Sequence, residues 1–309
     1  QCFDHPFWLD QTEVTQADFA RLGGQKANLN YFDGELRPVE TITWFEARDF
    51  CALRGARLPT EREWEYAARG PDSLVYPWGN DWNENNAVST LQGTAEVGGI
   101  QDGASWVGAF DMSGNVWEWL NTIWGIDTDG DFDFNGPGEP IYTYPYHDDG
   151  REQNSESTTS VRVLRGGTWF VQDTGVLRAA YRTANLPDFS SNYHGFRCAR
   201  SDGPTAPLVA DPGVSALNPV THNADWTPVI QNFDGVPMVK VQPGCFMMGM
   251  SDAEIDDLIQ QYPASAEFWR ENGAQHQQCF NEPFWIDQTE VTQSQFARVV
   301  GVAHRSSYF

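Results

Sequence analysis

A loop of alternating acidic residues carries one pattern typical of metal ligands. It contains Asp131, Asp133 and Asn135, followed directly by Gly136. Oxygen donors at alternate positions ahead of a glycine match the opening of an EF-hand calcium loop. The closing glutamate of such a loop is absent, because Tyr142 occupies its position. Two interpretations therefore stay equally open here, a metal-binding loop and a solvated acidic loop.

A second stretch, "RGGTWFVQDTGVLRAAYR" at residues 165–182, has glycines and aromatic residues arranged as in a functional loop. It contains few side chains that could react. Two glycines close an expected strand, and an aromatic pair follows them. The loop after the glycines offers three side chains for chemistry, those of Thr168, Gln172 and Asp173. No nucleophile-elbow motif accompanies them, and the histidines of the chain show no metal spacing.

The cysteines are widely scattered along the chain. There are five, at Cys2, Cys51, Cys198, Cys245 and Cys279, with no CxxC pair and no Cys/His ligand spacing. Zinc is therefore not expected. Scattered cysteines favour long-range disulfides and an extracytoplasmic location, periplasmic, cell-surface or secreted. The odd number leaves one thiol over.

The charge balance excludes some classes of partner. The 309 residues include 43 acidic and 19 basic side chains, for a formal charge of −24. Such a surface repels nucleic acid and anionic lipid, so we expect neither as a partner. No long apolar run is present, so we expect no membrane insertion. The acidic surface suits divalent cations or simple solubility.

The chain repeats its own opening. "QCFDHPFWLDQTEVTQADFAR" at Gln1 returns as "QCFNEPFWIDQTEVTQSQFAR" at Gln278. The distance is too long for a solenoid unit and indicates a duplicated domain. We expect a domain at 1–202 that lacks its first strand, a Pro- and Gly-rich linker at 203–225, and the N-terminal portion of a second copy at 226–309.

Capping residues predict short helices in the first copy. Thr15 precedes an amphipathic run, and capping boxes are formed by Thr43 with Glu46 and by Thr60 with Glu63. After the third helix, Trp, Gly, Asn and Asp dominate and regular periodicity fades. The pattern predicts an α+β domain with long structured loops.

Five sequence blocks carry a resemblance to one family. They are "PVETITWFEARDFCALRGARLPTEREWEYAARG", "YPWGN", "FDMSGNVWEW", "RVLRGGTWF" and "GFRCAR", and the resemblance that they carry covers essentially all of 38–200. Their order resembles the formylglycine-generating enzyme domain, also called the sulfatase-modifying factor domain. The resemblance implies a C-type-lectin-like fold with low regular secondary structure.

The same resemblance bears on catalysis. Enzymes of this family oxidise a substrate cysteine to formylglycine, using two cysteines that bind copper(I). The matching positions here are Val171 and Val176. Valine has no lone pair and no redox chemistry, so we expect neither copper nor formylglycine-generating activity.

The family also binds structural calcium, and one of its sites lies in the "DMSGNVWEW" block. The implied ligands are Asp111, Gly114, Val116 and Glu118. Oxygen donors of this kind suit calcium. The alternative is that Glu118 forms an ion pair with an arginine.

A second calcium site of the family would use the side chain of Asn86 and the carbonyl group of Ala87. The position expected to supply its carboxylate holds Ser89, a poor ligand, which places this site in doubt.

The resemblance further implies a disulfide between Cys51 and Cys198. Separately, Cys245 and Cys279 flank one opening block of the second copy and form a second candidate pair. Cys2 would then be left over.

The repeat also predicts how the two copies share one fold. The first copy lacks the strand that residues 238–250 supply in the second copy. We expect 238–250 to dock on the 1–202 domain. Residues 278–309 would then duplicate a slot that 1–32 already fills.

Two functions follow from these features. The first is a non-catalytic module, stabilised by calcium, that binds a protein or glycan ligand, with duplication adding avidity. The alternative is an oxidoreductase-related enzyme that acts on a protein or sulfur-containing substrate through a changed active site. Bound copper or iron would favour the enzyme.

Overall fold

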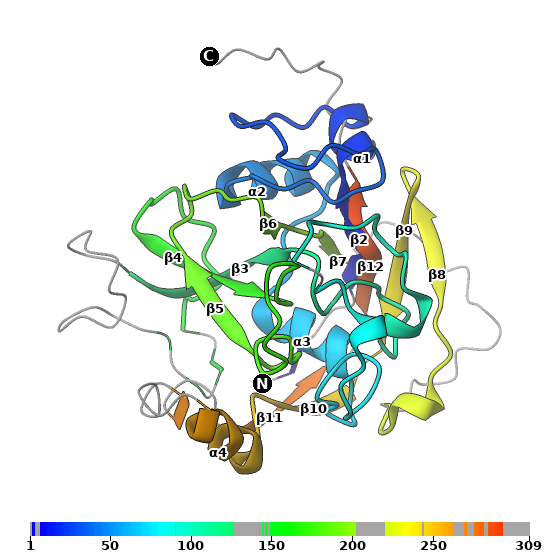
Figure 1. The fold of residues 1–309 in the computed structure, drawn as a ribbon, viewed down its shortest axis with the longest axis vertical. Coiled ribbons are helices and arrows are strands. Elements are labelled where there is room, and N and C mark those ends of the chain that lie inside the picture. The colour runs from blue at the N-terminus through cyan, green and yellow to red at the C-terminus, as the bar shows by residue number, and fades with distance from the viewer. Residues whose placement is uncertain are drawn as a thin grey trace.

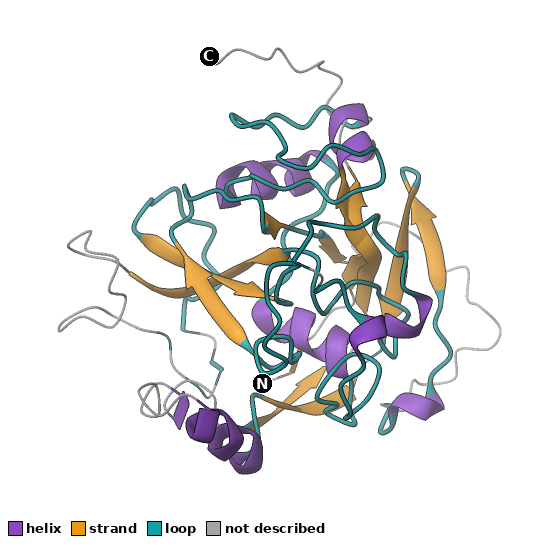
Figure 2. Cartoon of the chain, viewed as in Figure 1, coloured by secondary structure: helices purple, strands orange, loops and turns teal. Residues whose placement is uncertain are grey.

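The structure is a computed structural model. It describes residues 2–3, 7–89, 91–126, 142, 144, 146–147, 149–201, 220–242, 244–261, 269–270, 275–280 and 284–292. The fold mixes short helices with small, curled sheets and long ordered loops (Figures 1 and 2). Within these ranges, no helix is both long enough and apolar enough to cross a bilayer.

Short helices begin where the capping residues predict. They are α1 (Gln16–Arg21), α2 (Trp44–Leu53) and α3 (Glu61–Arg69). Thr43 and Thr60 each accept from a helix N–H group, and Glu46 and Glu63 close the two capping boxes. These reciprocal bonds satisfy N–H groups that a helix start otherwise leaves unpaired. The predicted helices are therefore confirmed.

The strands form three sheets. The first has the order β12–β7–β2–β9–β8, the second β5–β4–β3–β6 and the third β1–β11–β10. In the first copy the strands are β1 (Cys2–Phe3), β2 (Phe7–Thr15), β3 (Trp117–Ile126), β4 (Ser160–Arg165), β5 (Arg182–Asn185), β6 (His194–Gly195) and β7 (Ala199–Ser201). Later in the chain come β8 (Ile230–Phe233), β9 (Val236–Val241), β10 (Gly244–Met248), β11 (His276–Phe280) and β12 (Phe284–Thr292).

Other short elements connect the sheets. Single 3₁₀ turns lie at η1 (Glu84–Asn86), η2 (Gln101–Gly103) and η3 (Asn223–Asp225). Helix α4 (Asp252–Gln261) follows β10. Leu258 of α4 is fully buried, and a Cβ atom on Gly175 would lie 2.8 Å from its side chain. The tight fit seats α4 against the loop that follows the two glycines of the "RGG" stretch.

The core consists largely of tryptophans and aliphatic side chains. Trp44, Trp64 and Trp119 are fully buried, and Ala68 lies in the same core cluster as Trp64. The indole N–H group of each of these three tryptophans has an acceptor; for example, Trp44 donates to the Leu120 carbonyl oxygen at 2.9 Å. These three large indoles thus fill the space between small sheets without leaving their own polar atoms unpaired.

Residues 238–250 dock on the first copy, as the sequence predicts. Strand β9 pairs with β2 in an antiparallel register. The ring of Phe246 on β10 lies 5.0 Å from the ring of Tyr66 on α3. The Gly249 N–H group donates to Glu65 at 2.8 Å, and Arg69 donates to the Gly249 carbonyl oxygen at 2.6 Å. The segment is therefore held by backbone pairing, apolar packing and charged hydrogen bonds.

Strands β2 and β12 share partners in the first sheet (Figure 1). Val239 of β9 is opposite Ile230 of β8, Leu9 of β2 and Ile286 of β12. A strand has two edges, and β8 occupies one edge of β9. The other edge can hold one strand at a time. β2 and β12 also pair with each other in a parallel register, with Asp10 opposite Asp287. We therefore expect residues 7–15 and 284–292 to compete for this edge of β9.

Cysteine trapping tests this exchange. We expect both the L9C/V239C and the I286C/V239C variants to form the engineered disulfide, because directly opposite residues on antiparallel strands lie within reach of a bridge. Peptide mapping by mass spectrometry under non-reducing conditions measures each yield. The off-register variant L9C/V241C is the control and should not cross-link. If the L9C/V239C variant cross-linked and the I286C/V239C variant did not, residues 7–15 would hold this edge of β9 permanently.

Candidate functional site

The "DMSGNVWEW" block forms a tight turn whose backbone excludes most residue types. Asp111 and Asn115 have positive φ angles of 58° and 56°, and Gly114 has φ of 95°. A Cβ atom on Gly114 would lie 2.4 Å from the Val88 carbonyl oxygen. The turn also docks on the "RGG" stretch, since the Gly114 N–H group donates to the Gly166 carbonyl oxygen at 2.7 Å. Glycine is therefore required at this close approach.

Glu118 lies at the centre of the block, fully buried. Its two oxygens accept from Nε and Nη2 of Arg197 at 2.6 and 2.7 Å. Trp64 Nε1 also donates to Oε2 at 2.7 Å. Burial raises the pKa of Glu118, and Arg197 acts in the opposite direction. The arginine pairing that the sequence left open as an alternative is thus present.

Asp111 is a second buried carboxylate beside this pair. It is 8% exposed, and its Oδ2 accepts from the Gly98 N–H group at 2.5 Å. Burial raises the pKa of Asp111 to about 6; the Gly98 hydrogen bond and Arg197 lower it, and Glu118 raises it further. The carboxyl group is therefore held in an environment that disfavours its own charge, and a cation would relieve this penalty.

The proposed calcium ligands fit the ion in part. Asp111 and Glu118 supply hard oxygens and lie near enough to influence each other's charge. A carboxylate has about four acceptor positions, and Glu118 uses three of them on protein donors. In the described ranges no three His, Cys, Asp or Glu side chains gather as ligands, so backbone carbonyls would complete the shell. Calcium through Asp111, Gly114, Val116 and Glu118 stays a prediction.

The other two predicted metal sites gain no further support. Asn86 ends η1, and its carbonyl oxygen would lie 2.3 Å from a Cβ atom on Gly103. This carbonyl group therefore faces the backbone of η2, while the site through Asn86 and Ala87 stays untested. The acidic loop with Asp131, Asp133 and Asn135 lies outside the described residues.

Val171 and Val176 lie in a loop closed by turns. The Val171 N–H group donates to the Thr168 carbonyl oxygen, and the Val176 N–H group to the Asp173 carbonyl oxygen, both at 3.1 Å. The Asp173 side chain accepts from the Gly175 N–H group at 2.8 Å. Val176 packs against the core cluster around α2. The loop is thus an ordered segment closed by turns, in which Val176 supplies an apolar contact to the core.

Beside this loop lies a set of aromatic side chains that sequence reasoning missed. We name Tyr31, Phe32, Trp169 and Phe170 the aromatic ladder. Successive ring centroids are 4.9, 5.1 and 5.3 Å apart. Tyr31 is 71% exposed and Phe170 is 60% exposed. The sequence signal for this cluster consists of the aromatic pairs "YF" at 31–32 and "WF" at 169–170, which are far apart along the chain.

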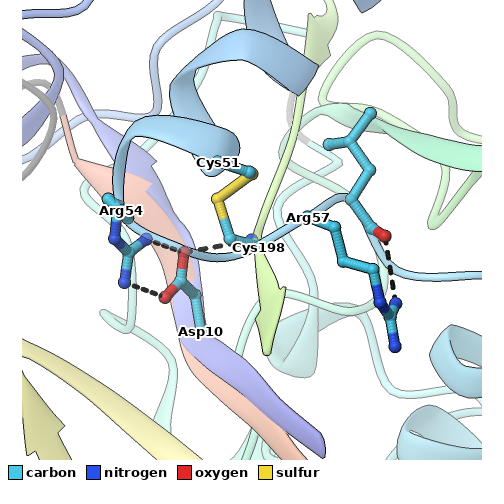
Figure 3. The surroundings of a disulfide bond; sticks show 6 residues. Asp10, Cys51, Arg54, Arg57 and Cys198 are labelled. Carbon is cyan, nitrogen blue, oxygen red and sulfur yellow. Dashed lines mark hydrogen bonds and ion pairs between the residues drawn. A yellow bond between two sulfur atoms is a disulfide. The ribbon is translucent and has the colours of Figure 1, made fainter. Parts of the chain in front are cut away.

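The disulfide that the resemblance implies is present (Figure 3). Cys51 on α2 is bonded to Cys198, with Cα atoms 5.5 Å apart. Next to it, Asp10 pairs with Arg54 and accepts from the Cys198 N–H group at 3.0 Å. Burial raises the pKa of Asp10 to about 7, against the lowering effect of Arg54. The bridge thus fixes α2 to the segment that leads into β7, whose Cys198 N–H group is bonded to Asp10 of β2.

Cys245 is also disulfide-bonded. The antiparallel register of β10 and β11 places it opposite Cys279, and the parallel register of β1 and β11 places Cys2 opposite Cys279 as well. The side chains of Cys2 and Cys279 lie outside the described part of the structure. The pairing of Cys245 with Cys279 therefore stays a prediction.

Buried ion pairs extend from α3 across the second sheet. Glu61 accepts from Arg182 Nε at 2.6 Å and from Arg165 Nη2 at 2.8 Å. Arg165 also pairs with Glu65 at 2.7 Å, and Glu65 pairs with Arg69 at 2.9 Å. All five side chains are at most 3% exposed. The network holds the helix and the strands that frame the 168–176 loop.

A family model agrees with this architecture and with the sequence blocks. The model of the sulfatase-modifying factor enzyme 1-like domain matches residues 2–202 and 227–307. The chain belongs to this family.

Curated relatives include active and inactive enzymes by name. The inactive C-alpha-formylglycine-generating enzyme 2 of Bos taurus is 34% identical over 184 residues, covering 54% of this chain and 51% of the relative. The formylglycine-generating enzyme of Mus musculus is 32% identical over 220 residues, covering 65% of this chain and 53% of the relative. The chain thus spans about half the length of these relatives.

One similar solved structure is Treponema denticola variable protein 1. It is 23% identical, with a TM-score of 0.47, and the match covers 63% of this chain and 84% of that chain.

Asp111 gives a test of the calcium site. In a chelator at pH 7.5, D111N should raise the free energy of unfolding by at most about 3 kcal/mol, because a carboxyl group whose folded pKa is raised from 3.8 to about 6 opposes folding once it ionises. The folded state binds the proton more tightly, so the stability that this group contributes is full below about pH 4 and is lost as pH rises through 6. D111N should therefore show no gain at pH 3.5. Urea unfolding at the two pH values measures this.

Calcium should reverse this order, so that the native protein becomes more stable than D111N. At a hundredfold excess over Kd the native protein should gain about 2.7 kcal/mol, and D111N should gain little. The exposed Asp102→Asn variant is the matched control and should respond like the native protein. An equal calcium response in D111N and the native protein would remove Asp111 from the site.

Proposed function

We propose that the chain is a non-catalytic module of the sulfatase-modifying factor family that binds a protein or glycan ligand. One observation carries the proposal: Val171 and Val176 stand at the positions that match the copper-binding cysteines. Thiolates are the soft ligands that copper(I) requires, and valine supplies no donor atom. The frame around the loop is nonetheless intact, with the "RGG" glycines docked on the "GNVWEW" turn.

Two further facts support a binding role. A relative at 34% identity is named an inactive form of the enzyme, so loss of catalysis within this family has a counterpart. Tyr31 and Phe170, the two ends of the aromatic ladder, are exposed, and Phe170 belongs to the 168–176 loop itself. Exposed, ordered aromatic rings are typical of binding surfaces, because they bury a large area and lose little conformational entropy.

The wider proposal concerns the frame and the compartment. The module has a C-type-lectin-like arrangement, takes structural calcium through Asp111 and Glu118, and acts outside the cytoplasm. The buried Cys51–Cys198 bridge supports this compartment, because disulfides persist in oxidising environments. The alternative is an oxidoreductase-related enzyme, which needs a redox metal bound by clustered ligands. Within the ranges described, no three His, Cys, Asp or Glu side chains are arranged so that they could hold a metal ion.

The loss of catalysis can be measured directly. We expect no conversion of a cysteine-containing sulfatase peptide in the presence of copper(I), oxygen and reductant, because no thiolate pair is available. Mass spectrometry of the peptide detects aldehyde formation. The V171C/V176C variant provides the comparison and should withdraw copper(I) from a chromophoric chelator, whereas V171C alone should withdraw less. Turnover by the native protein above a blank reaction would overturn the proposal.

The aromatic ladder is the expected ligand-binding face. Arrayed glycans and a displayed random-peptide library serve as probes, and F170A should reduce binding of at least one retained probe at least tenfold, because it removes a largely exposed ring from the face. Leu53, 48% exposed on α2, gives the control variant L53A. Equal losses in F170A and L53A would show that the face is not the binding surface.

A further inference from the structure

A cavity separate from the aromatic ladder lies between the loop at residues 75–82 and helix α4. Its volume is about 350 Å³. Tyr76 and Trp82 line one wall, and Arg178, Glu254 and Asp257 line the other. The volume is near the lower end of the range for small-molecule sites. The cavity therefore has room for a ligand of about one ring.

The aromatic wall is rigid. Tyr76 and Trp78 stack with ring centroids 5.3 Å apart and planes 7° from parallel. The Trp82 ring lies 5.2 Å from the Tyr76 ring. Tyr76 Oη donates to the Thr174 carbonyl oxygen at 3.1 Å, and Trp78 Nε1 to the Asp81 carbonyl oxygen at 3.1 Å. The wall is held in place before any ligand arrives, which reduces the entropy lost on binding.

The polar wall carries hydrogen-bonding atoms that the protein leaves unused. Arg178 Nη2 donates to Asp257 at 2.6 Å, while its buried Nε and Nη1 have no partner. Glu254 Oε2 accepts from the Ser251 N–H and hydroxyl groups at 2.8 Å, while its buried Oε1 has no partner. Buried polar atoms without partners are costly, so a ligand that supplies both acceptors and donors would relieve two penalties together.

The charge of the cavity narrows the ligand class. Asp81, Glu254 and Asp257 outnumber Arg178, whose charge is already paired with Asp257. An anionic ligand would meet two uncompensated carboxylates, which excludes phosphates and acidic sugars. A purely apolar ligand would offer no partner to Arg178 Nε and Nη1 or to Glu254 Oε1, which have none among the described residues. A neutral ligand with an apolar face and several hydroxyl groups satisfies both walls.

We propose that this cavity binds a neutral sugar residue. The apolar face of the pyranose ring packs on Trp82, and Arg178 and Glu254 turn their enclosed polar atoms toward hydroxyl groups of the sugar. The inference rests on the proposed function, because it identifies the ligand of the module as a glycan. It adds a site that is independent of the aromatic ladder and of calcium.

Saturation-transfer NMR with methyl glycosides of glucose, galactose and mannose tests the site, with glucuronic and sialic acids as anionic comparisons. We expect at least one neutral glycoside to bind and neither acid to do so. W82A and E254Q should each weaken the binding at least tenfold. Both positions are partly exposed, and circular dichroism checks that the variants remain folded.

F189A is the matched aromatic control, because Phe189 is 39% exposed and belongs neither to the aromatic ladder nor to the lining of the cavity. It should not change binding of the methyl glycoside. Absence of binding by every neutral glycoside, or equal binding by W82A and the native protein, would overturn this inference. If glycans or peptides still bound through Phe170 in that case, the proposed function would stand without the sugar cavity.

Discussion

The buried pairing of Glu118 with Arg197 is the constraint on which the rest of the structure depends. Both side chains are fully enclosed, and each would carry an uncompensated charge without the other. Trp64 of α3 completes the carboxylate shell. The pair therefore joins α3, β3 and the segment that leads into β7. With few regular elements and small sheets, the fold is held by charged hydrogen bonds that allow one arrangement of these segments.

Local rules made part of this architecture predictable. Thr43 and Thr60 mark helix starts because capping depends on residues three positions apart, and such short-range chemistry is visible in a sequence. The Cys51–Cys198 bridge could be anticipated because the blocks around it resemble a family with that pairing. The docking of 238–250 could be anticipated because this segment stands directly before the repeat of the opening block.

Long-range partners were beyond prediction from sequence. The partner of Glu118 lies 79 residues away, and the buried chain offers several arginines. The aromatic ladder brings Phe32 beside Trp169, and no period or spacing connects these positions. The cavity near Trp82 similarly needs α4, whose docking depends on Leu258 fitting over a glycine. Tertiary packing creates these features, so single-sequence patterns cannot report them.

The Cys51–Cys198 bridge has a mechanical consequence. It joins residues 147 positions apart, so a pulling force applied to the two ends of the chain passes through the sulfur–sulfur bond and leaves the intervening loop unloaded. At ~3.4 Å per residue, roughly 500 Å of polypeptide cannot be drawn out while the bond is intact. The tryptophan-rich interior, the "GNVWEW" turn and the cavity all lie mostly within that shielded length. Under tension, the strands outside the bridge would unfold first. The segment between Cys51 and Cys198 would carry no load until a reductant cleaves the disulfide.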